Sequence, residues 1–366
     1  MARVKFSTGT DQAAAVSFSP TVLAVVGTAT KEDISINTPT EMDSVEDATE
    51  NFGSGPIVDF VKAAHAVDSG GGERILGVRY AADADATAQE AAIEVLRSEA
   101  AQIGGHSADI FAAPGLSADT ISTKAESVAE DIRGIYLRGV AATTAADAAT
   151  EVVADGIRGK RILNIYPHIR ISGEGSDVSP TGAVAGLIAR NDRFAGGLAI
   201  SPSNKRLQGV TTGAVKVDFD PDSSTSDLSI LTGAEILVIT SRRGALRTYG
   251  GELDDSGVFA SVPVRRVVDE IERRFTDVVD NFIDSDPNHD RYNETNIHSL
   301  SIHLGSSIDH AVAEGILDGG DISPDVPFNS LDTNRSSGSV QFIAELHVPN
   351  FMKVINIRIT ASFTSG

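Results

Sequence analysis

The sequence contains no cysteine and no tryptophan. The lack of cysteine excludes a disulfide framework, a thiol nucleophile and a thiolate zinc site. Aromatic residues make up only 5% of the chain, which argues against a sugar or nucleobase site built on stacking. No apolar run approaches the roughly 20 residues that span a bilayer, and the start, MARVKFSTGT, lacks an apolar signal region. We therefore expect a soluble, unsecreted chain without membrane insertion.

Basic residues are scarce as well. Lysine and arginine total 30 against 51 aspartate and glutamate, so the formal net charge is -21, and only 8 of the basic residues are lysine. Such a chain repels phosphate backbones, so no direct nucleic-acid partner is expected. An acidic, lysine-poor surface is typical of proteins dissolved in concentrated salt, where the Debye length falls to about 3 Å at 1 M. A hypersaline origin is our preferred interpretation, and an ordinary acidic cytoplasmic protein is the alternative.

Two loops superficially match ligand-binding motifs. The glycine-rich loop Ser69–Arg74 precedes a strand, whereas a phosphate-binding loop follows one, so it predicts a connecting turn. The stretch Asp218–Asp222 begins like a calcium loop, but Ser223 stands where glycine is required and Ser229 where glutamate is required. A solvated turn is the better interpretation.

Catalytic and metal-binding patterns are missing too. His298, His303 and His310 have no HExxH motif and no obvious carboxylate on the same face, so we interpret them as surface or capping histidines. No GxSxG nucleophile motif occurs, and nothing singles out one carboxylate pair. We therefore assign no catalytic residue, no metal ligand and no cofactor. An enzyme would have to be inferred from fold analogy alone.

Strand-like and helix-like segments alternate through the first two thirds of the chain. Short apolar runs at residues 21–27, 74–80, 108–115, 135–141, 161–171 and 233–240 predict strands. Amphipathic segments between the first five predict helices, one of which we expect to begin at a capping box formed by Thr87 and Glu90. This alternation predicts an α/β fold with a mixed, largely parallel sheet.

The last third reads as a smaller α+β domain. Apolar residues at helical spacing predict one long helix from Val264 to Ile283, and a second helical segment follows at 294–317. Two strands follow, and in the last of them Ile355, Ile357 and Ile359 share one face. At the other end of the chain, Ala2, Val4 and Phe6 alternate with Arg3, Lys5 and Ser7. The chain thus begins and ends in amphipathic strands.

One patterned segment carries almost no chemically active residue. Ser179–Asn204 reads SPTGAVAGLIARNDRFAGGLAISPSN, in which two Ser-Pro turns bracket a small-residue helix and a Gly-Gly pair. Small residues let two backbones approach closely. The segment therefore predicts close packing, either inside the core or between copies of the chain.

These segments together resemble the tail sheath proteins of contractile phage tails and related contractile injection systems. The resemblance runs through VVGTATKEDISINTPTEMDSVEDATENFG, IFAAPG, RILNIYPHIRI, the Ser-Pro segment and VPVRRVVDEIERRFTDVVDNFI. The chain departs from the family at VITSRRGALRT, where a Trp-Gly-Ala-Arg-Thr run is usual, and in its lack of the customary C-terminal tryptophan. At 366 residues it is also short, which implies few or no outer decorating domains.

The resemblance implies a domain organisation and a function. It implies an N-terminal arm at 1–18, an α/β sheath domain at 19–248, an α+β inner domain at 249–347 and a C-terminal arm strand at 348–366. The subunits would stack as six-fold helical rings around a tail tube, with baseplate and tail-terminator proteins as further partners. Such a chain would be assembled in the host cytoplasm and reside in the virion of a haloarchaeal virus or virus-like particle. A nucleotide-dependent α/β enzyme and a non-contractile structural virion protein are the alternatives.

Two sets of residues follow as candidates for contacts between proteins. We expect Val4 and Phe6, together with Ile355, Ile357 and Ile359, to make strand contacts between subunits, because an unpaired strand edge binds another chain. Four arginines of the long helix are candidates for facing the tail tube, and intrahelical pairing with Asp269, Glu270 and Asp277 explains them equally well. The four are Arg265, Arg266, Arg273 and Arg274.

Overall fold

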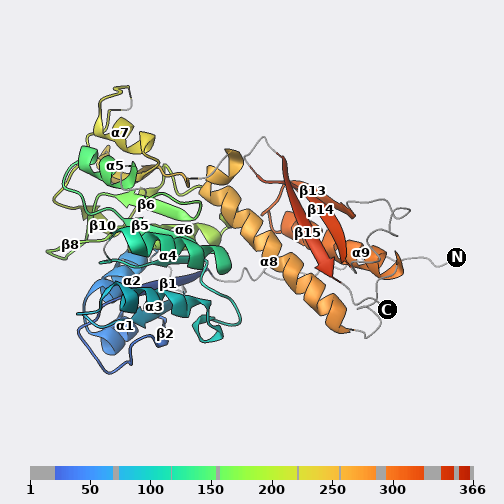
Figure 1. Ribbon diagram of the computed structural model, residues 1–366. Helices are drawn as coiled ribbons and strands as arrows, with labels where there is room; N and C mark the ends of the chain where they lie inside the picture. The colour runs from blue at the N-terminus through green and yellow to red at the C-terminus, as the bar shows by residue number, and fades with distance from the viewer. Residues whose placement is uncertain are drawn as a thin grey trace, which may run out of the picture.

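The computed structural model contains two α/β bodies joined by one long helix (Figure 1). The larger body is built on a nine-stranded sheet and the smaller one on a three-stranded sheet. Helix α8 (Val262–Ser285) runs diagonally between them in Figure 1. The structure describes residues 21–68, 74–116, 118–153, 157–220, 222–254, 257–285, 294–324, 339–349 and 354–362.

The large sheet is mixed but mostly parallel, which confirms the α/β fold class predicted from the sequence. Its strand order is β2-β3-β1-β4-β5-β6-β11-β12-β9, and the pairs from β3 through β11 are parallel. Strands β2, β12 and β9 join it in antiparallel pairs at its two edges. The strands are β1 (Val22–Gly27), β2 (Pro39–Met42), β3 (Arg74–Arg79), β4 (Ile110–Ala112), β5 (Ile135–Gly139), β6 (Ile162–Tyr166), β9 (Arg206–Leu207), β11 (Leu237–Arg242) and β12 (Ala245–Gly250).

Helices cover both faces of this sheet, which explains why its central strands read as continuous apolar runs. On β1, Leu23 and Val25 belong to one apolar core, whereas Val22, Ala24 and Val26 belong to the core on the opposite face. Helices α1, α2 and α6 contribute to the first core, helices α3 and α4 to the second, and helices α5 and α7 to a third core near β11. The helices are α1 (Val45–Phe52), α2 (Pro56–Val67), α3 (Ala86–Glu94), α4 (Ala118–Asp131), α5 (Ala145–Val153), α6 (Thr181–Asp192) and α7 (Asp227–Gly233).

Two local predictions were wrong. The run RILNIYPHIRI forms two strands instead of one, because the chain turns at the cis Tyr166–Pro167 bond and β7 (Ile169–Ile171) leaves the large sheet. Strand β7 pairs instead with β8 (Asp177–Val178) and β10 (Val210–Thr212) in a small antiparallel sheet. The N-cap of α3 is Asp85, whose carboxylate accepts the Ala88 N–H at 2.8 Å, and not Thr87. The helix ends at Glu94, and short 3₁₀ turns follow it.

The second body has its own apolar core between two helices and a sheet. The long helix α8 and helix α9 (Glu294–Ala313) pack against strands β13 (Gly319–Pro324), β14 (Ser339–His347) and β15 (Val354–Ser362). The stripe predicted for α8 is largely confirmed, because Val264, Val267, Ile271 and Phe275 are all buried in this core. Two short 3₁₀ turns, at Gly197–Ala199 and Gly257–Ala260, contact α8.

The segment Ser179–Asn204 contains α6, which packs against α2 inside the large body. Every residue of α6 except Arg190 is buried. A Cβ atom on Gly182 would lie 2.3 Å from the carbonyl oxygen of Phe60, and one on Gly186 would lie 2.3 Å from that of Ala64. Because neither glycine has a Cβ atom, the two helix backbones approach more closely than larger residues would allow. Of the two kinds of close packing left open by the sequence, α6 shows packing within the core of a single chain.

Candidate functional site

The junction between the two bodies contains a buried ion pair. Arg266 of α8 donates two hydrogen bonds to Asp192 at the end of α6, at 2.8 and 2.6 Å. Arg266 is 6% exposed and Asp192 is 8% exposed, and the Thr21 hydroxyl donates a further hydrogen bond to the same carboxylate. Burial lowers the pKa of the Arg266 guanidinium, but the neighbouring Asp192, Asp109 and Glu270 together outweigh it and leave the pKa above its usual range. The guanidinium is therefore charged, and its ion pair with Asp192 holds α8 against α6.

A second buried pair lies farther along the same junction. Arg161, which directly precedes β6, donates to both carboxylate oxygens of Asp269 on α8 at 2.7 Å each. The Arg161 guanidinium also donates to the carbonyl oxygen of Gly134 at 3.2 Å. Removing one partner of a buried pair leaves an uncompensated charge, which typically costs about 3–5 kcal/mol. Two such pairs therefore tie α8 to the large body.

A chain of alternating charges crosses the junction beside these pairs. Arg273 contacts Asp109 of the large body at 2.6 Å and Glu270 at 3.0 Å. Arg274 contacts Glu270 at 2.8 Å and Glu314, just beyond α9, at 2.6 Å. The network therefore connects the large body, α8 and the end of α9.

All four arginines proposed to face a tube make contacts within the chain. Intrahelical pairing is found for Arg273 and Arg274, through Glu270 rather than Asp269 or Asp277. The Arg265 guanidinium lies over the Phe259 ring at 4.7 Å. Arg266 is buried, so its side chain does not lie on the surface of the chain. Contact between these arginines and a second protein stays a prediction.

Strand β15 lies at one edge of the three-stranded sheet in the described part of the chain. Its order is β13-β14-β15, and β15 pairs with β14 over nine residues in antiparallel register. No strand in the described part of the chain pairs with the other edge of β15, which we call the open edge. A groove of about 370 Å³ runs between this edge and α8. Its lining includes Phe275 and Val279 from α8, and Ile357, Arg358 and Thr360 from β15.

The C-terminal strand thus belongs to the sheet of its own chain. Ile355 is 4% exposed and Ile357 is 7% exposed, and both belong to the second core. Ile359 pairs in register with Phe342 of β14. The apolar face of β15 therefore covers its own core, and contacts of Ile355, Ile357 and Ile359 with another subunit stay a prediction. Val4 and Phe6 lie outside the described residues, so their predicted contacts are untested.

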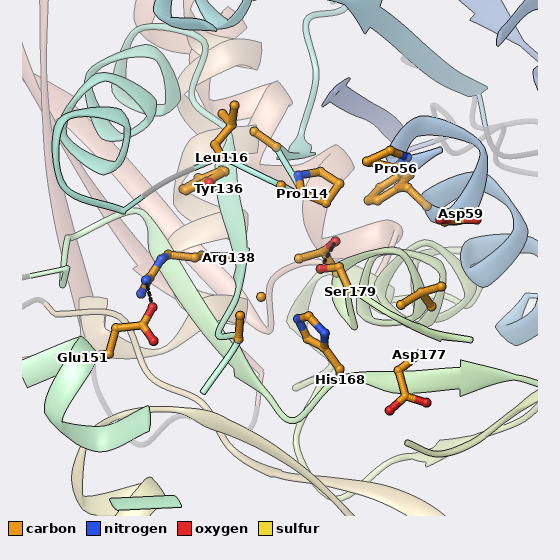
Figure 2. Close-up of a pocket in the computed structure, with 17 residues that line it drawn as sticks. Pro56, Asp59, Pro114, Leu116, Tyr136, Arg138, Glu151, His168, Asp177 and Ser179 are labelled. Carbon is orange, nitrogen blue, oxygen red and sulfur yellow. Dashed lines mark hydrogen bonds and ion pairs between the residues drawn. The ribbon is translucent and has the colours of Figure 1, made fainter. Parts of the chain in front are cut away.

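A cavity lies beside the carboxyl ends of β4 and β5 (Figure 2). It measures about 530 Å³, and its lining includes Asp59, Arg138, Glu151, His168 and Ser179. Ligands of parallel α/β sheets commonly bind at this end of the strands. The cavity is therefore the place where an enzyme with this fold would be expected to hold its substrate.

One pair of oppositely charged side chains lies in this cavity. Figure 2 shows Arg138 and Glu151 pointing toward one another, and they form an ion pair. Burial lowers the pKa of His168 and raises the pKa of Asp59. Among the described residues, however, no hydrogen bond joins the His168 ring to Ser179, whose hydroxyl lies 3.1 Å from that of Thr181. The cavity thus lacks the linked nucleophile and base that acyl transfer requires.

The motifs interpreted as structural take local roles. Asp220 accepts the Asp222 N–H at 3.1 Å, and Asp227 accepts the Asp218 N–H at 3.0 Å, so these carboxylates organise a turn. His298, His303 and His310 are exposed on α9. Within the described ranges, no group of three potential ligands is placed to hold a metal ion. Nor does any helix described there have the length and apolar character needed to cross a membrane.

Comparison with solved structures finds the same fold in contractile sheaths. The chain is similar to the helical sheath of the anti-feeding prophage in its contracted state, with a TM-score of 0.69 and 18% identity over 97% of this chain and 99% of that chain. It is similar to the contracted sheath of the PVC extracellular contractile injection system, with a TM-score of 0.67 and 16% identity over 98% and 97%. The sheath tail protein of Desulfitobacterium hafniense matches with a TM-score of 0.64 and 10% identity over 94% and 97%.

No family model matches the sequence, and no curated protein matches it. The similarity is therefore one of fold, and it extends through both bodies. The chain has the fold of tail sheath proteins.

Proposed function

We propose that the chain is a structural subunit of a contractile tail sheath. It would polymerise as stacked helical rings around a tail tube and contract to drive that tube through the envelope of a target cell. The observation that carries the proposal is the match to sheath folds over nearly the whole of both chains, for example 97% of this one and 99% of the anti-feeding prophage sheath. Both bodies take part in that match, so the likeness is not limited to a common α/β core.

The groove beside the open edge suggests how copies join. A strand that adds to the open edge of β15 would satisfy its backbone N–H and C=O groups. The N-terminal sequence suits this position, because Val4 and Phe6 alternate with the basic residues Arg3 and Lys5. Apolar side chains would meet Phe275 and Val279 of α8, and the basic ones, on the opposite face of the strand, would point away from this helix. We therefore propose that the N-terminal strand of one copy occupies this groove of another.

Contraction of the proposed sheath would need no nucleotide. Extended rings would store free energy in contacts between subunits and release it when they rearrange to a shorter, wider array. The buried pairs at the junction would hold the two bodies of each subunit together during this movement. Strands exchanged between copies would keep neighbours connected.

Electron microscopy of negatively stained protein tests the proposal. A sheath subunit forms tubes or stacked rings in high salt, whereas an α/β enzyme forms discrete small oligomers. A variant lacking residues 1 to 15 should lose these polymers and retain the circular-dichroism spectrum and thermal transition of the full chain. Tubes of normal appearance from the shortened chain would exclude the N-terminal strand as the connection between subunits.

We also infer an origin in concentrated salt, as in a haloarchaeal virus or virus-like particle. The support is the net charge of -21 and the small number of lysines. Salt screens the mutual repulsion of these charges, so the thermal midpoint should rise steadily between about 0.1 M and about 1 M KCl. A midpoint that does not change with salt would favour an ordinary acidic protein.

A further inference from the structure

The exposed face of α9 carries almost no charge. From Thr295 to Ala313 the sequence has a single charged residue, Asp309, if histidines are neutral. Helix α8, by comparison, has ten charged residues among 24. The exposed α9 positions in this stretch are Thr295, His298, Ile302, His303, Ser306, Asp309, His310, Val312 and Ala313. This face is therefore unusual in a chain whose net charge is -21.

Apolar side chains are exposed on this face and next to it. Ile302 is 59% exposed and Val312 is 36% exposed. Phe194, at 61%, lies in the loop whose Gly196 N–H donates to the Glu314 carbonyl at 3.1 Å, just beyond the end of α9. These are three of the five exposed large apolar residues in the described part of the chain. Exposed apolar side chains on a surface almost free of charge are typical of a site that binds another protein.

We propose that this α9 face binds a second copy of the chain. Two copies each carry a net charge of -21, so a surface almost free of charge lets them meet with little local repulsion between like charges. The α9 face meets that condition from Thr295 to Ala313, about 28 Å of helix, with Asp309 as its single charged residue and the exposed Glu294 just before it. The inference deepens the proposed sheath function and rests on it, because a sheath is a polymer of identical subunits.

The position of α9 fits this partner. Helix α9 and the open edge of β15 belong to the same small body, so a copy connected at that edge is held close to the α9 face. A groove of about 480 Å³ beside α9 is lined by Arg274, Asp277 and Val278 from α8, by His303, Ser306 and His310 from α9, and by Glu314 just beyond it. Its charges are of both signs, and Arg274 pairs with Glu314, so side chains of the second copy could enter this groove without meeting a row of like charges.

A pair of matched variants tests the proposal. Ile302→Glu places a charge on the α9 face, and Ile36→Glu places the same charge at a site of similar exposure, 52%, in the large body. We expect Ile302→Glu to raise the protein concentration needed for assembly by about tenfold or more. Ile36→Glu should assemble like the wild type. Ser306→Glu adds a charge to the same face without replacing an apolar residue and should act like Ile302→Glu.

The outcomes separate this inference from the proposed function. Circular dichroism and thermal melting show whether each variant is folded before assembly is compared. Normal assembly by Ile302→Glu and Ser306→Glu would overturn the inference and leave the sheath function intact. The inference would also be overturned if the variants form normal tubes but fail to bind a tube protein, because the face would then belong to that partner. If the wild-type chain forms no polymer, the proposed function itself fails.

Discussion

Asp192 and Arg266 form a two-point ion pair across the junction of the two bodies, at 2.8 and 2.6 Å, although they are 74 residues apart in the sequence. Both side chains are more than nine-tenths buried. Arg266→Ala should lower the free energy of unfolding by about 3–5 kcal/mol, because Asp192 would remain buried without its partner. The shift of the urea unfolding midpoint, combined with the slope of the transition, measures this loss.

Two controls show whether the loss comes from the unpaired charge. Replacing both partners, as Arg266→Met with Asp192→Leu, should cost clearly less than Arg266→Ala because no buried charge is left uncompensated. The exposed pair Lys62–Glu174 should contribute only about 0–1 kcal/mol, so Lys62→Ala should have little effect. If Arg266→Ala costs no more than Lys62→Ala, the junction is not held by this pair.

Gly186 allows α6 to lie close to α2, so a single methyl group should disrupt their packing. Gly186→Ala would place a Cβ atom 2.3 Å from the Ala64 carbonyl oxygen, and we expect it to destabilise the chain by about 1–3 kcal/mol. Gly233→Ala at the end of α7 is the matched control, because a Cβ atom there has no neighbour within 4 Å. That control should be neutral or slightly stabilising in thermal melting. Equal melting temperatures for the two variants would contradict the close approach.

His168 should make stability depend on pH. Burial lowers the pKa of His168 from the usual 6.5, and Asp177 opposes this only in part. The unfolded chain therefore binds a proton more readily than the folded chain below about pH 6.5, and stability is lost as the pH falls toward the lower, folded pKa. Burial also lowers the pKa of His65, so His65 changes stability with pH in the same direction. Burial raises the pKa of Asp59, which changes stability with pH in the opposite direction.

The variant His168→Gln should therefore lose less stability than the wild type between about pH 7.5 and about pH 5.5. Urea unfolding at the two pH values measures the difference. His106→Gln is the comparison, because that imidazole is exposed. Equal pH dependence in the wild type and His168→Gln would show that burial of His168 does not control it.

Val4 and Phe6 are predicted to carry the apolar contacts of the N-terminal strand. Val4→Asp with Phe6→Asp should prevent assembly at concentrations where the wild type forms polymers, because two charges would face the apolar floor of the groove. Lys5→Thr with Ser7→Thr alters the opposite face of the strand and should retain polymers. Sedimentation of the assembled fraction gives the comparison. Retention of polymers by the aspartate variant would place the connection between copies elsewhere.

The sequence predicted most of the alternating strands and helices well, because the patterns that indicate them are local. Apolar runs marked the buried parallel strands, and the stripe of α8 marked the face that packs on the second sheet. The break in RILNIYPHIRI was missed because each half has strand character, and only the turn at Pro167 separates β6 from β7. Thr87 and Glu90 matched a capping pattern, but Asp85 two residues earlier is the residue that caps the helix.

The ion pairs between the two bodies could not be predicted from local sequence patterns. The partners of Arg266 and Arg161 are 74 and 108 residues away, and no local pattern distinguishes Asp192 or Asp269 from other acidic residues. The sequence predicted that the arginines either face a tube or pair within the helix, whereas the fold buries Arg266 against the large body. The uncharged face of α9 was visible in the sequence as a long stretch with one acidic residue, but its exposure became known only from the structure.

A cryo-EM map of the polymer, at a resolution that traces strands, shows whether a strand of one copy completes the sheet of another. We expect a fourth strand hydrogen-bonded to the open edge of β15 and continuous with the N-terminus of a neighbouring copy. A sheet that remains three-stranded in the polymer, or a fourth strand supplied by the same chain, would contradict it.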